Sequence, residues 1–164
     1  MKSQSKFELT PEKLPYGNGE VADALNSVLA DTFAIYMKTK NFHWHVTGPH
    51  FHDYHLMLDE QAAQIISTTD DIAERVRKMG CNTLRSIGDI SSRQTIKDND
   101  SLSVDAISML KELRGDNLAL IESLRQAKKI VDDAGDNGTS GLIDNWTDLA
   151  EGRAWFLFEA IQPA

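Results

Sequence analysis

Hydrophobic residues recur at helical spacing along most of the chain. Between residues 19 and 46 they fall three or four positions apart, which is the pattern of one face of an α-helix. The Gly48-Pro49 turn ends this segment, because glycine and proline interrupt regular helices. A second helix is predicted over residues 50–79, with Gly80 as its C-terminal cap.

The second half of the chain has the same helical pattern after a polar link. Residues 81–100 hold a short apolar element at most. A third helix is predicted to start near Ser101 or Ser103, since serine is a good N-cap, and to reach about residue 133. A fourth helix is predicted from Thr139 to about residue 162. Four long helices with a longer link between the second and third predict an all-α four-helix bundle.

The composition is that of one globular domain. Of the 164 residues, 41% are hydrophobic and 26% are charged, which excludes a disordered or fibrous chain. We expect a flexible leader over residues 1–19 and a single domain over residues 20–164. Cys81 is the only cysteine, so a disulfide framework and a multi-cysteine metal site are excluded. No apolar run suggests a secretory signal or a membrane span, and the cytoplasm is the expected compartment.

The net charge narrows the class of partner. Asp and Glu total 25 against 17 Lys and Arg, which gives a formal charge of −8. Affinity for the phosphates of nucleic acids rises with the number of neutralising cations, so general nucleic-acid coating is disfavoured. An acidic chain suits a cationic cargo, although acidity also keeps proteins soluble.

A histidine and carboxylate pattern points to a metal site. All five histidines fall within 13 residues. His55 and Asp59 are four positions apart on the second helix, and Asp70 and Glu74 repeat that spacing on nearly the same face. However, Asp59 and Asp70 lie ~16 Å apart along one helix axis, so they cannot share an ion within one chain.

A second copy of the helix removes this difficulty. If two copies cross antiparallel about a two-fold axis, His55 faces Glu74 and Asp59 faces Asp70, because the residue numbers of each pair add to 129. The pattern therefore predicts two identical sites at a dimer interface, each built from both subunits. The alternative is an ordinary solvated face, in which the acids from Asp70 to Glu74 pair with nearby basic residues.

His43, across the turn from His55, can complete this set of ligands. Imidazoles and carboxylates without thiolate favour iron, manganese or zinc over copper(I), and carboxylates suit iron that changes oxidation state. No histidine follows His55, so the Glu-x-x-His pairs of di-iron sites inside one bundle are absent. A metal-binding bundle without redox turnover is the other metal-based alternative.

These motifs resemble the Dps family, the ferritin-like mini-ferritins of prokaryotes. The resemblance covers nearly the whole chain and rests on residues 40–44, 48–49, 55–59, 70–75 and 154–160. It implies a ferritin-like bundle with a short helix between helices 2 and 3, assembled as a hollow dodecamer. It also implies a ferroxidase that oxidises Fe(II), preferably with hydrogen peroxide, and stores the ferric mineral, protecting DNA and the cell from oxidative damage.

Residue by residue, the resemblance implies an iron centre shared between subunits, with two such sites per two-fold interface. His43, His55 and Asp59 would come from one chain and Asp70 and Glu74 from its mate. Zinc or manganese are the expected substitutes for iron. Trp44 matches a family tryptophan beside the centre, which implies a catalytic role as an electron or radical relay, although Trp44 can equally be a core aromatic residue. His45, His50 and His52 match no ligand position and are expected to be structural or surface residues.

Two further expectations concern the cage. Acidic residues at three-fold pores would concentrate Fe(II), and the candidates are Asp132, Asp133, Asp136, Asp144 and Asp148. The alternative for each of these acids is helix-end capping or simple exposure to solvent. A DNA-compacting nucleoid protein with incidental metal sites is the alternative function, because some family members bind DNA through basic tails. The leader of this chain is nearly neutral in charge, so DNA binding is the less favoured of the two functions.

Overall fold

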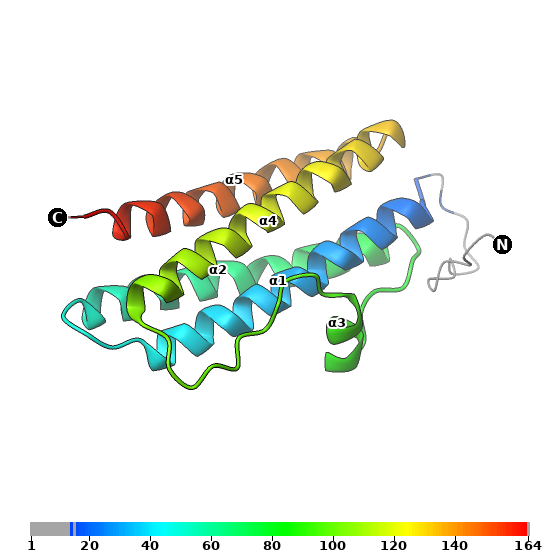
Figure 1. Cartoon of the computed structure of the whole chain (residues 1–164). Helices are drawn as coiled ribbons and strands as arrows, with labels where there is room; N and C mark the ends of the chain where they lie inside the picture. Colours follow the sequence, from blue (N-terminus) through cyan, green and yellow to red (C-terminus); the bar gives the residue numbers. More distant parts are fainter. Residues whose placement is uncertain (1–13, 15, 164) are drawn as a thin grey trace.

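The structure, a computed structural model, describes residue 14 and residues 16–163. This part of the chain contains the helices α1 (Gly19–His45), α2 (Phe51–Lys78), α3 (Ile87–Arg93), α4 (Ala106–Asp133) and α5 (Asn137–Ala160) (Figure 1). The all-α four-helix bundle with a short extra helix is therefore confirmed. Most of the expected leader lies outside the described residues, and the domain division at residue 19 stays a prediction.

The long helices form two antiparallel pairs, α1 with α2 and α4 with α5, and the pairs pack on each other (Figure 1). The link between α2 and α4 runs along the bundle, so these two helices point in the same direction. Helix α3 lies within this link and packs against α1. The polar stretch after residue 80 forms this long link, which we call the crossover.

The predicted end of the second helix is confirmed. Gly80 has a φ of +76°, in the left-handed region that favours glycine. Its N–H donates to the carbonyl of Arg77, and the N–H of Cys81 donates to the carbonyl of Val76. These two bonds form a Schellman motif, which satisfies carbonyls that the helix end leaves open.

The predicted start of the third long helix is wrong. Helix α4 begins at Ala106, and its N-cap is Asp105 instead of Ser101 or Ser103. The Asp105 carboxylate accepts hydrogen bonds from the N–H and the hydroxyl of Ser108, at 2.9 and 2.6 Å. The N–H of Ser101 donates to the Asn99 side chain at 3.0 Å, which holds this residue in the crossover. The Asp105 carboxylate, which accepts two hydrogen bonds from Ser108, therefore places the N-cap two to four residues after the predicted serines.

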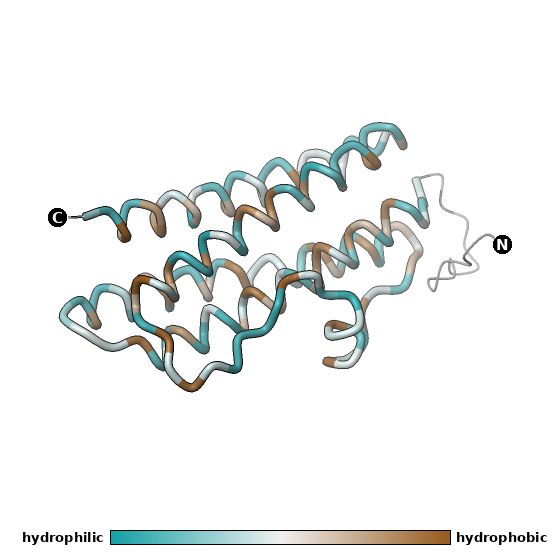
Figure 2. The backbone as a smooth tube through the Cα atoms, in the orientation of Figure 1, coloured by the Kyte–Doolittle hydropathy of each residue, from teal (hydrophilic) through white to brown (hydrophobic). Residues whose placement is uncertain are grey.

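The core consists of two clusters of buried side chains. The larger cluster fills the part of the bundle that contains the start of α1 and the end of α2, and it includes Leu25, Ile65, Ile72, Ile121 and Trp146. The smaller one includes Phe42, Leu58, Leu110, Leu113 and Leu157. Hydrophobic positions recur along the whole length of the helices, as Figure 2 shows in brown. None of the described helices combines the length and apolar character that crossing a membrane requires.

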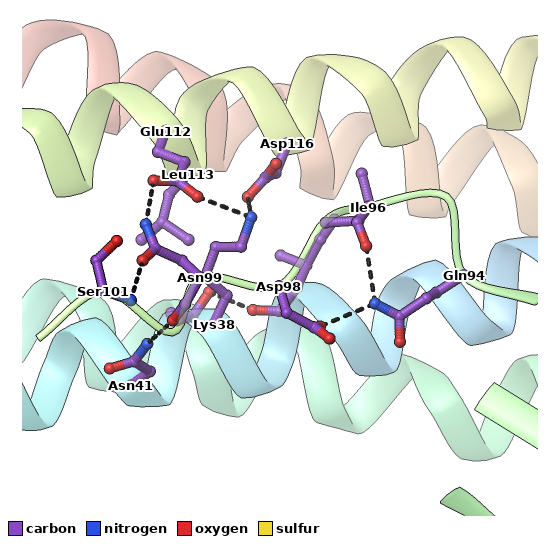
Figure 3. Close-up of polar contacts among 12 residues, drawn as sticks. Lys38, Asn41, Gln94, Ile96, Asp98, Asn99, Ser101, Glu112, Leu113 and Asp116 are labelled. Atoms are coloured by element: carbon purple, nitrogen blue, oxygen red, sulfur yellow. Dashed lines mark hydrogen bonds and ion pairs between the residues drawn. The ribbon is translucent and has the colours of Figure 1, made fainter. Parts of the chain in front are cut away.

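Buried polar groups fasten the crossover to the bundle. Lys38 of α1 is 5% exposed and forms ion pairs with Glu112 at 3.0 Å and Asp116 at 2.9 Å on α4. Glu112 also accepts a hydrogen bond from Asn99 of the crossover at 2.7 Å, as Figure 3 shows. Burial raises the pKa of the Asp116 carboxyl, and the hydrogen bond and charge of Lys38 partly offset this. The network ties α1, α4 and the crossover together.

A second buried carboxylate holds the crossover further along α1. Asp31, 2% exposed, accepts hydrogen bonds from the N–H of Thr95 at 2.6 Å, its hydroxyl at 2.7 Å and the N–H of Ile96 at 3.0 Å. Three donors compensate the carboxylate for its lost hydration. The crossover is therefore attached to α1 through its own backbone.

An ion pair connects the end of α2 to the turn before α5. Arg75 donates to the carboxylate of Asp136 at 2.8 Å and to the hydroxyl of Thr139 at 2.8 Å. Asp136 is the N-cap of α5, and its side chain is only 7% exposed. Burial alone would raise the pKa of the Asp136 carboxyl, but the hydrogen bonds from Thr139 and the charge of Arg75 together lower it.

Because the folded pKa of Asp136 is depressed, its contribution to stability is present above the unfolded value near 3.8 and is lost as pH falls through the folded value. We expect Asp136→Asn to lower the free energy of unfolding by about 2 kcal/mol at neutral pH. The difference from the wild type should shrink below about pH 4. Urea denaturation at fixed protein concentration across this pH range measures it.

The matched control is Asp133→Asn at the exposed end of α4, which should leave stability nearly unchanged. A stability difference for Asp136→Asn that stays constant from neutral pH to pH 3 would contradict the assigned role of the carboxylate charge.

Candidate metal centre

The end of α1 and the first turns of α2 place two histidines face to face. The rings of His43 and His55 are stacked, with centroids 3.8 Å apart and planes 21° apart. The Nδ1 atom of each ring lies 2.8 Å from the backbone carbonyl oxygen of the other residue. Phe42 and Leu58, both in the smaller core cluster, anchor the two helices beside this pair.

The reciprocal hydrogen bonds determine the tautomer of both rings. A carbonyl oxygen can only accept, so Nδ1 must carry the proton in each case. The Nε2 lone pairs of His43 and His55 are then free in the neutral imidazoles. This is the arrangement in which a backbone carbonyl orients a histidine for binding a metal.

Asp59 lies one turn after His55 and completes a half-site. Its Oδ1 atom is 3.7 Å from Nε2 of His43, a separation that one bound ion can bridge, since each metal–ligand distance is about 2.1 Å. The side chain of His43 is 10% exposed, and that of Asp59 is 55% exposed. One wall of the half-site is therefore buried and the other is open.

Lys40 contacts the same carboxylate, a feature that the sequence analysis missed. Its Nζ atom donates to Oδ1 of Asp59 at 2.7 Å. The hydrogen bond and the charge of Lys40 hold the pKa of the Asp59 carboxyl below its usual value. The available signal was that Lys40 is three positions before His43, on the same side of α1. A metal ion at Asp59 would therefore have to share the carboxylate group with the ammonium group or displace it.

Asp70 and Glu74 are not brought to this half-site. Both are exposed on α2, and Glu74 has a weak ion pair with Lys78 at 4.0 Å. The helical rise leaves Asp70 ~16 Å from Asp59 along the axis. Among the described residues, no three His, Cys, Asp or Glu side chains converge to hold a metal ion. A complete centre therefore requires donors in addition to those that one chain brings together.

The other histidines lie outside the half-site. His45 donates to the carbonyl of Asn41 at 2.7 Å, and His50 packs against Tyr54. His52 is exposed beside Asp53. Trp44 is 56% exposed, with Nζ of Lys40 6.0 Å from its ring centroid, so it is neither a core aromatic residue within the chain nor one of the metal donors.

The candidate pore acids have different surroundings. Asp136 pairs with Arg75 and its side chain is largely covered within the chain, and a pore role for it stays a prediction. Asp144 pairs with Lys128 at 2.7 Å, and Asp132 accepts from Ser140 at 2.7 Å. Asp133 and Asp148 are exposed, and a pore role for them stays a prediction.

Comparison with known proteins supports the interpretation of the fold. Residues 22–162 match the family model of the ferritin-like domain. A low temperature-induced protein of Nostoc sp., described as uncharacterized, is 32% identical over 87% of this chain and 80% of its own. The DNA protection during starvation protein of Brevibacillus brevis is 28% identical over 84% of this chain and 91% of its own.

A solved structure agrees with these relatives. The Dps protein of Vibrio cholerae O1, described as a member of a broad superfamily of ferritin-like diiron-carboxylate proteins, matches with a TM-score of 0.83 and 26% identity. The match covers 87% of this chain and 89% of that one.

The contact between Lys40 and Asp59 can be tested directly. In Lys40→Met the Asp59 carboxyl loses its hydrogen bond and the adjacent positive charge, so its pKa should rise toward the ordinary value near 3.9. Carboxyl NMR titration of the metal-free protein measures the shift. Lys78→Met, which removes the ammonium beside Glu74, should leave the pKa of Asp59 unchanged. An unaltered Asp59 titration in Lys40→Met would contradict the assigned contact.

Proposed function

The chain belongs to the Dps family of ferritin-like proteins, and on this premise we propose that it is a ferroxidase that stores iron. In this proposal it oxidises Fe(II), preferably with hydrogen peroxide, and keeps the ferric product inside a cage of twelve chains. The observation that carries the proposal is the half-site at the turn between α1 and α2, where the oriented imidazoles of His43 and His55 stack and Oδ1 of Asp59 lies 3.7 Å from Nε2 of His43.

The donor set fits iron. His43 and His55 each offer Nε2, and Asp59 offers a carboxylate oxygen. Imidazole and carboxylate suit Fe(II), Mn(II) and Zn(II), so zinc or manganese can occupy the same site without turnover. Anionic oxygen donors favour the ferric state more than the ferrous state. The half-site therefore fits iron that arrives as Fe(II) and leaves oxidised.

Asp70 and Glu74 of a second copy are proposed to supply the remaining donors. On α2 they lie on nearly the same side as His55 and Asp59, and all of these except His55 are largely exposed. An antiparallel crossing near residues 64 and 65 would bring Asp59 against the partner's Asp70 and His55 against the partner's Glu74. Ala63 and Ser67, small and exposed, lie near this crossing and permit the helices to approach closely.

A groove beside this face supports the same assembly. It has a volume of about 1030 Å³ and lies between α1, α3 and the crossover. Apolar side chains on its lining include Met37 and Ile87, which are 55% and 81% exposed, and Ile66 of the proposed crossing face. Exposed apolar residues of this size favour cover by another chain. We propose that a second copy provides it, since the metal centre is incomplete without that copy.

The chemistry assigned to the centre is electron transfer from two Fe(II) ions. Each ion gives one electron to hydrogen peroxide, whose O–O bond breaks. The oxygen ends in ferric oxyhydroxide with oxygen from water, and protons are released. The chain binds and orients the two ions through His43, His55 and the carboxylates. Lys40 supplies a positive charge to Asp59 until an ion binds. Trp44, exposed next to His43, is proposed as a neighbouring aromatic residue and not as a ligand.

Removing Fe(II) and peroxide together prevents them from generating hydroxyl radical. This protects DNA without any contact between protein and DNA, which is consistent with the name of the Brevibacillus brevis relative. Direct DNA compaction is the weaker proposal, because the formal charge of the chain is −8 and phosphate binding requires clustered cations. A cytoplasmic location fits both versions.

The ferroxidase proposal predicts that the growth of ferric absorbance after mixing with Fe(II) and peroxide depends on the five donors. His55→Ala and Asp59→Ala should each slow the growth of ferric absorbance by about ten-fold or more, because each removes a side chain that binds iron directly. Glu74→Ala should have a similar effect, although it is remote from the half-site within one chain. Stopped-flow absorbance measures the rates.

Asp53→Ala is the matched control, since this acid is exposed on the first turn of α2 and is not assigned to the centre. Wild-type rates in both His55→Ala and Asp59→Ala would reject the assigned centre. Metal binding without ferric absorbance in the wild type would favour the non-redox bundle. The mass of the iron-free particle should correspond to about twelve chains, as expected for a closed shell, and iron loading should increase it.

A further inference from the structure

A groove between α2 and α5 contains a buried arginine whose charge is not neutralised. Arg153 of α5 is 5% exposed. Its Nε atom donates to Oδ1 of Asn117 at 2.8 Å, and its Nη1 atom donates to Oε1 of Gln64 at 2.7 Å. Both acceptors are neutral amides, and Nη2 has no hydrogen-bond partner among the described residues. A guanidinium with five donors is therefore only partly satisfied.

Two other basic side chains with little exposure, Lys38 and Arg75, differ from Arg153 because carboxylates neutralise their charges. Lys38 pairs with two carboxylates, and Arg75 pairs with Asp136. No ion pair involves Arg153 within the described part of the chain. Burial alone lowers the pKa of Arg153, to about 10, with no carboxylate to oppose the shift. Since a buried charge without a counter-charge is costly, an anion is the missing component.

The space beside the guanidinium can accept a small ligand. The groove has a volume of about 190 Å³ and is lined by Met57, Glu60, Gln61, Gln64, Gly152, Arg153 and Phe156. A Cβ atom added at Gly152 would meet nothing within 4 Å, so this side of the groove is open. The Oε1 atom of Gln64 accepts from Arg153, which leaves the Gln64 NH₂ group available as a second donor.

We propose that this groove is a binding site for a small oxyanion of the size of inorganic phosphate. Nη2 of Arg153 provides the charge-assisted hydrogen bond, and the amide of Gln64 provides a neutral one. Glu60 is the opposing charge on the same groove, and its carboxylate weakens the attraction.

The anion site is separate from the metal centre. At about 100° per residue, Met57, Gln61 and Gln64 point away from the side of α2 that carries His55, Asp59 and Asp70. The inference does not depend on the ferroxidase proposal, and it can be tested on metal-free protein. Loss of one activity need not affect the other.

The test is a titration of the metal-free, assembled protein with inorganic phosphate, monitored by phosphorus NMR line broadening and by the thermal midpoint. Chloride at equal ionic strength is the reference. We expect saturable binding in the wild type. Arg153→Gln should weaken it by about ten-fold or more, because a charge-assisted hydrogen bond is lost. Glu60→Gln should strengthen it roughly three-fold, because a repelling charge is removed.

Arg125→Gln is the matched control, since it removes an equal charge from an exposed position on α4. It should leave phosphate binding unchanged. Because Glu60 is exposed, Glu60→Gln is expected to fold and decides the question if Arg153→Gln does not. Absence of saturable binding in the wild type would overturn the proposal. This is also the result expected if a carboxylate of a neighbouring chain already occupies the groove. Equal losses in Arg153→Gln and Arg125→Gln, or no gain in Glu60→Gln, would also overturn it.

Discussion

The length of α2 is the constraint on which the account depends. This helix is continuous from Phe51 to Lys78, so the pair His55 and Asp59 is held about three turns from the pair Asp70 and Glu74. No rearrangement of side chains can bring carboxylates ~16 Å apart onto one ion. Either the second pair is ordinary surface charge, or another chain brings it to the centre. The open apolar groove beside the same face favours the second alternative, in which another chain supplies Asp70 and Glu74.

Packing in the core of the bundle holds the two helices that carry the half-site against each other. Phe42 and Leu58 are buried in one cluster, and this fixes the ends of α1 and α2 against each other. The reciprocal bonds between the imidazoles and the backbone then hold His43 and His55 in one tautomer. On the other side of α1, Asp31 and Lys38 fasten the crossover. The anion groove at Arg153 uses yet another face, between α2 and α5, so one helix serves two different sites.

Much of the fold could be predicted because helix periodicity and capping are local. The turn at Gly48, the end of α2 at Gly80 and the number of long helices all follow from nearby residues. The start of α4 could not be placed, since Ser101, Ser103 and Asp105 are all good caps and the choice depends on how the crossover is held. The buried role of Asp136 was equally hidden, because its partner Arg75 is 61 positions away.

The spacing of histidines and carboxylates along the chain was enough to select the candidate residues of the metal centre. His43 stacks on His55 and lies beside Asp59, whereas the role of all three as ligands, and the roles of Asp70 and Glu74 in a second chain, stay predictions. The pairing of Lys40 with Asp59, and the neutral surroundings of Arg153, depend on three-dimensional packing between helices. Neither contact leaves a distinctive local signature.

The central claim is that each metal centre takes donors from two chains, and subunit complementation tests it most directly. His55→Ala and Glu74→Ala, each expected to be strongly slowed alone, are co-expressed with different tags in equal amounts. A mixed dimer then has one centre with all five donors and one centre that lacks both. Random pairing predicts recovery of about one quarter of the wild-type rate of ferric oxidation per chain. A rate in the co-expressed assembly no higher than that of the two single variants would contradict a centre shared between subunits.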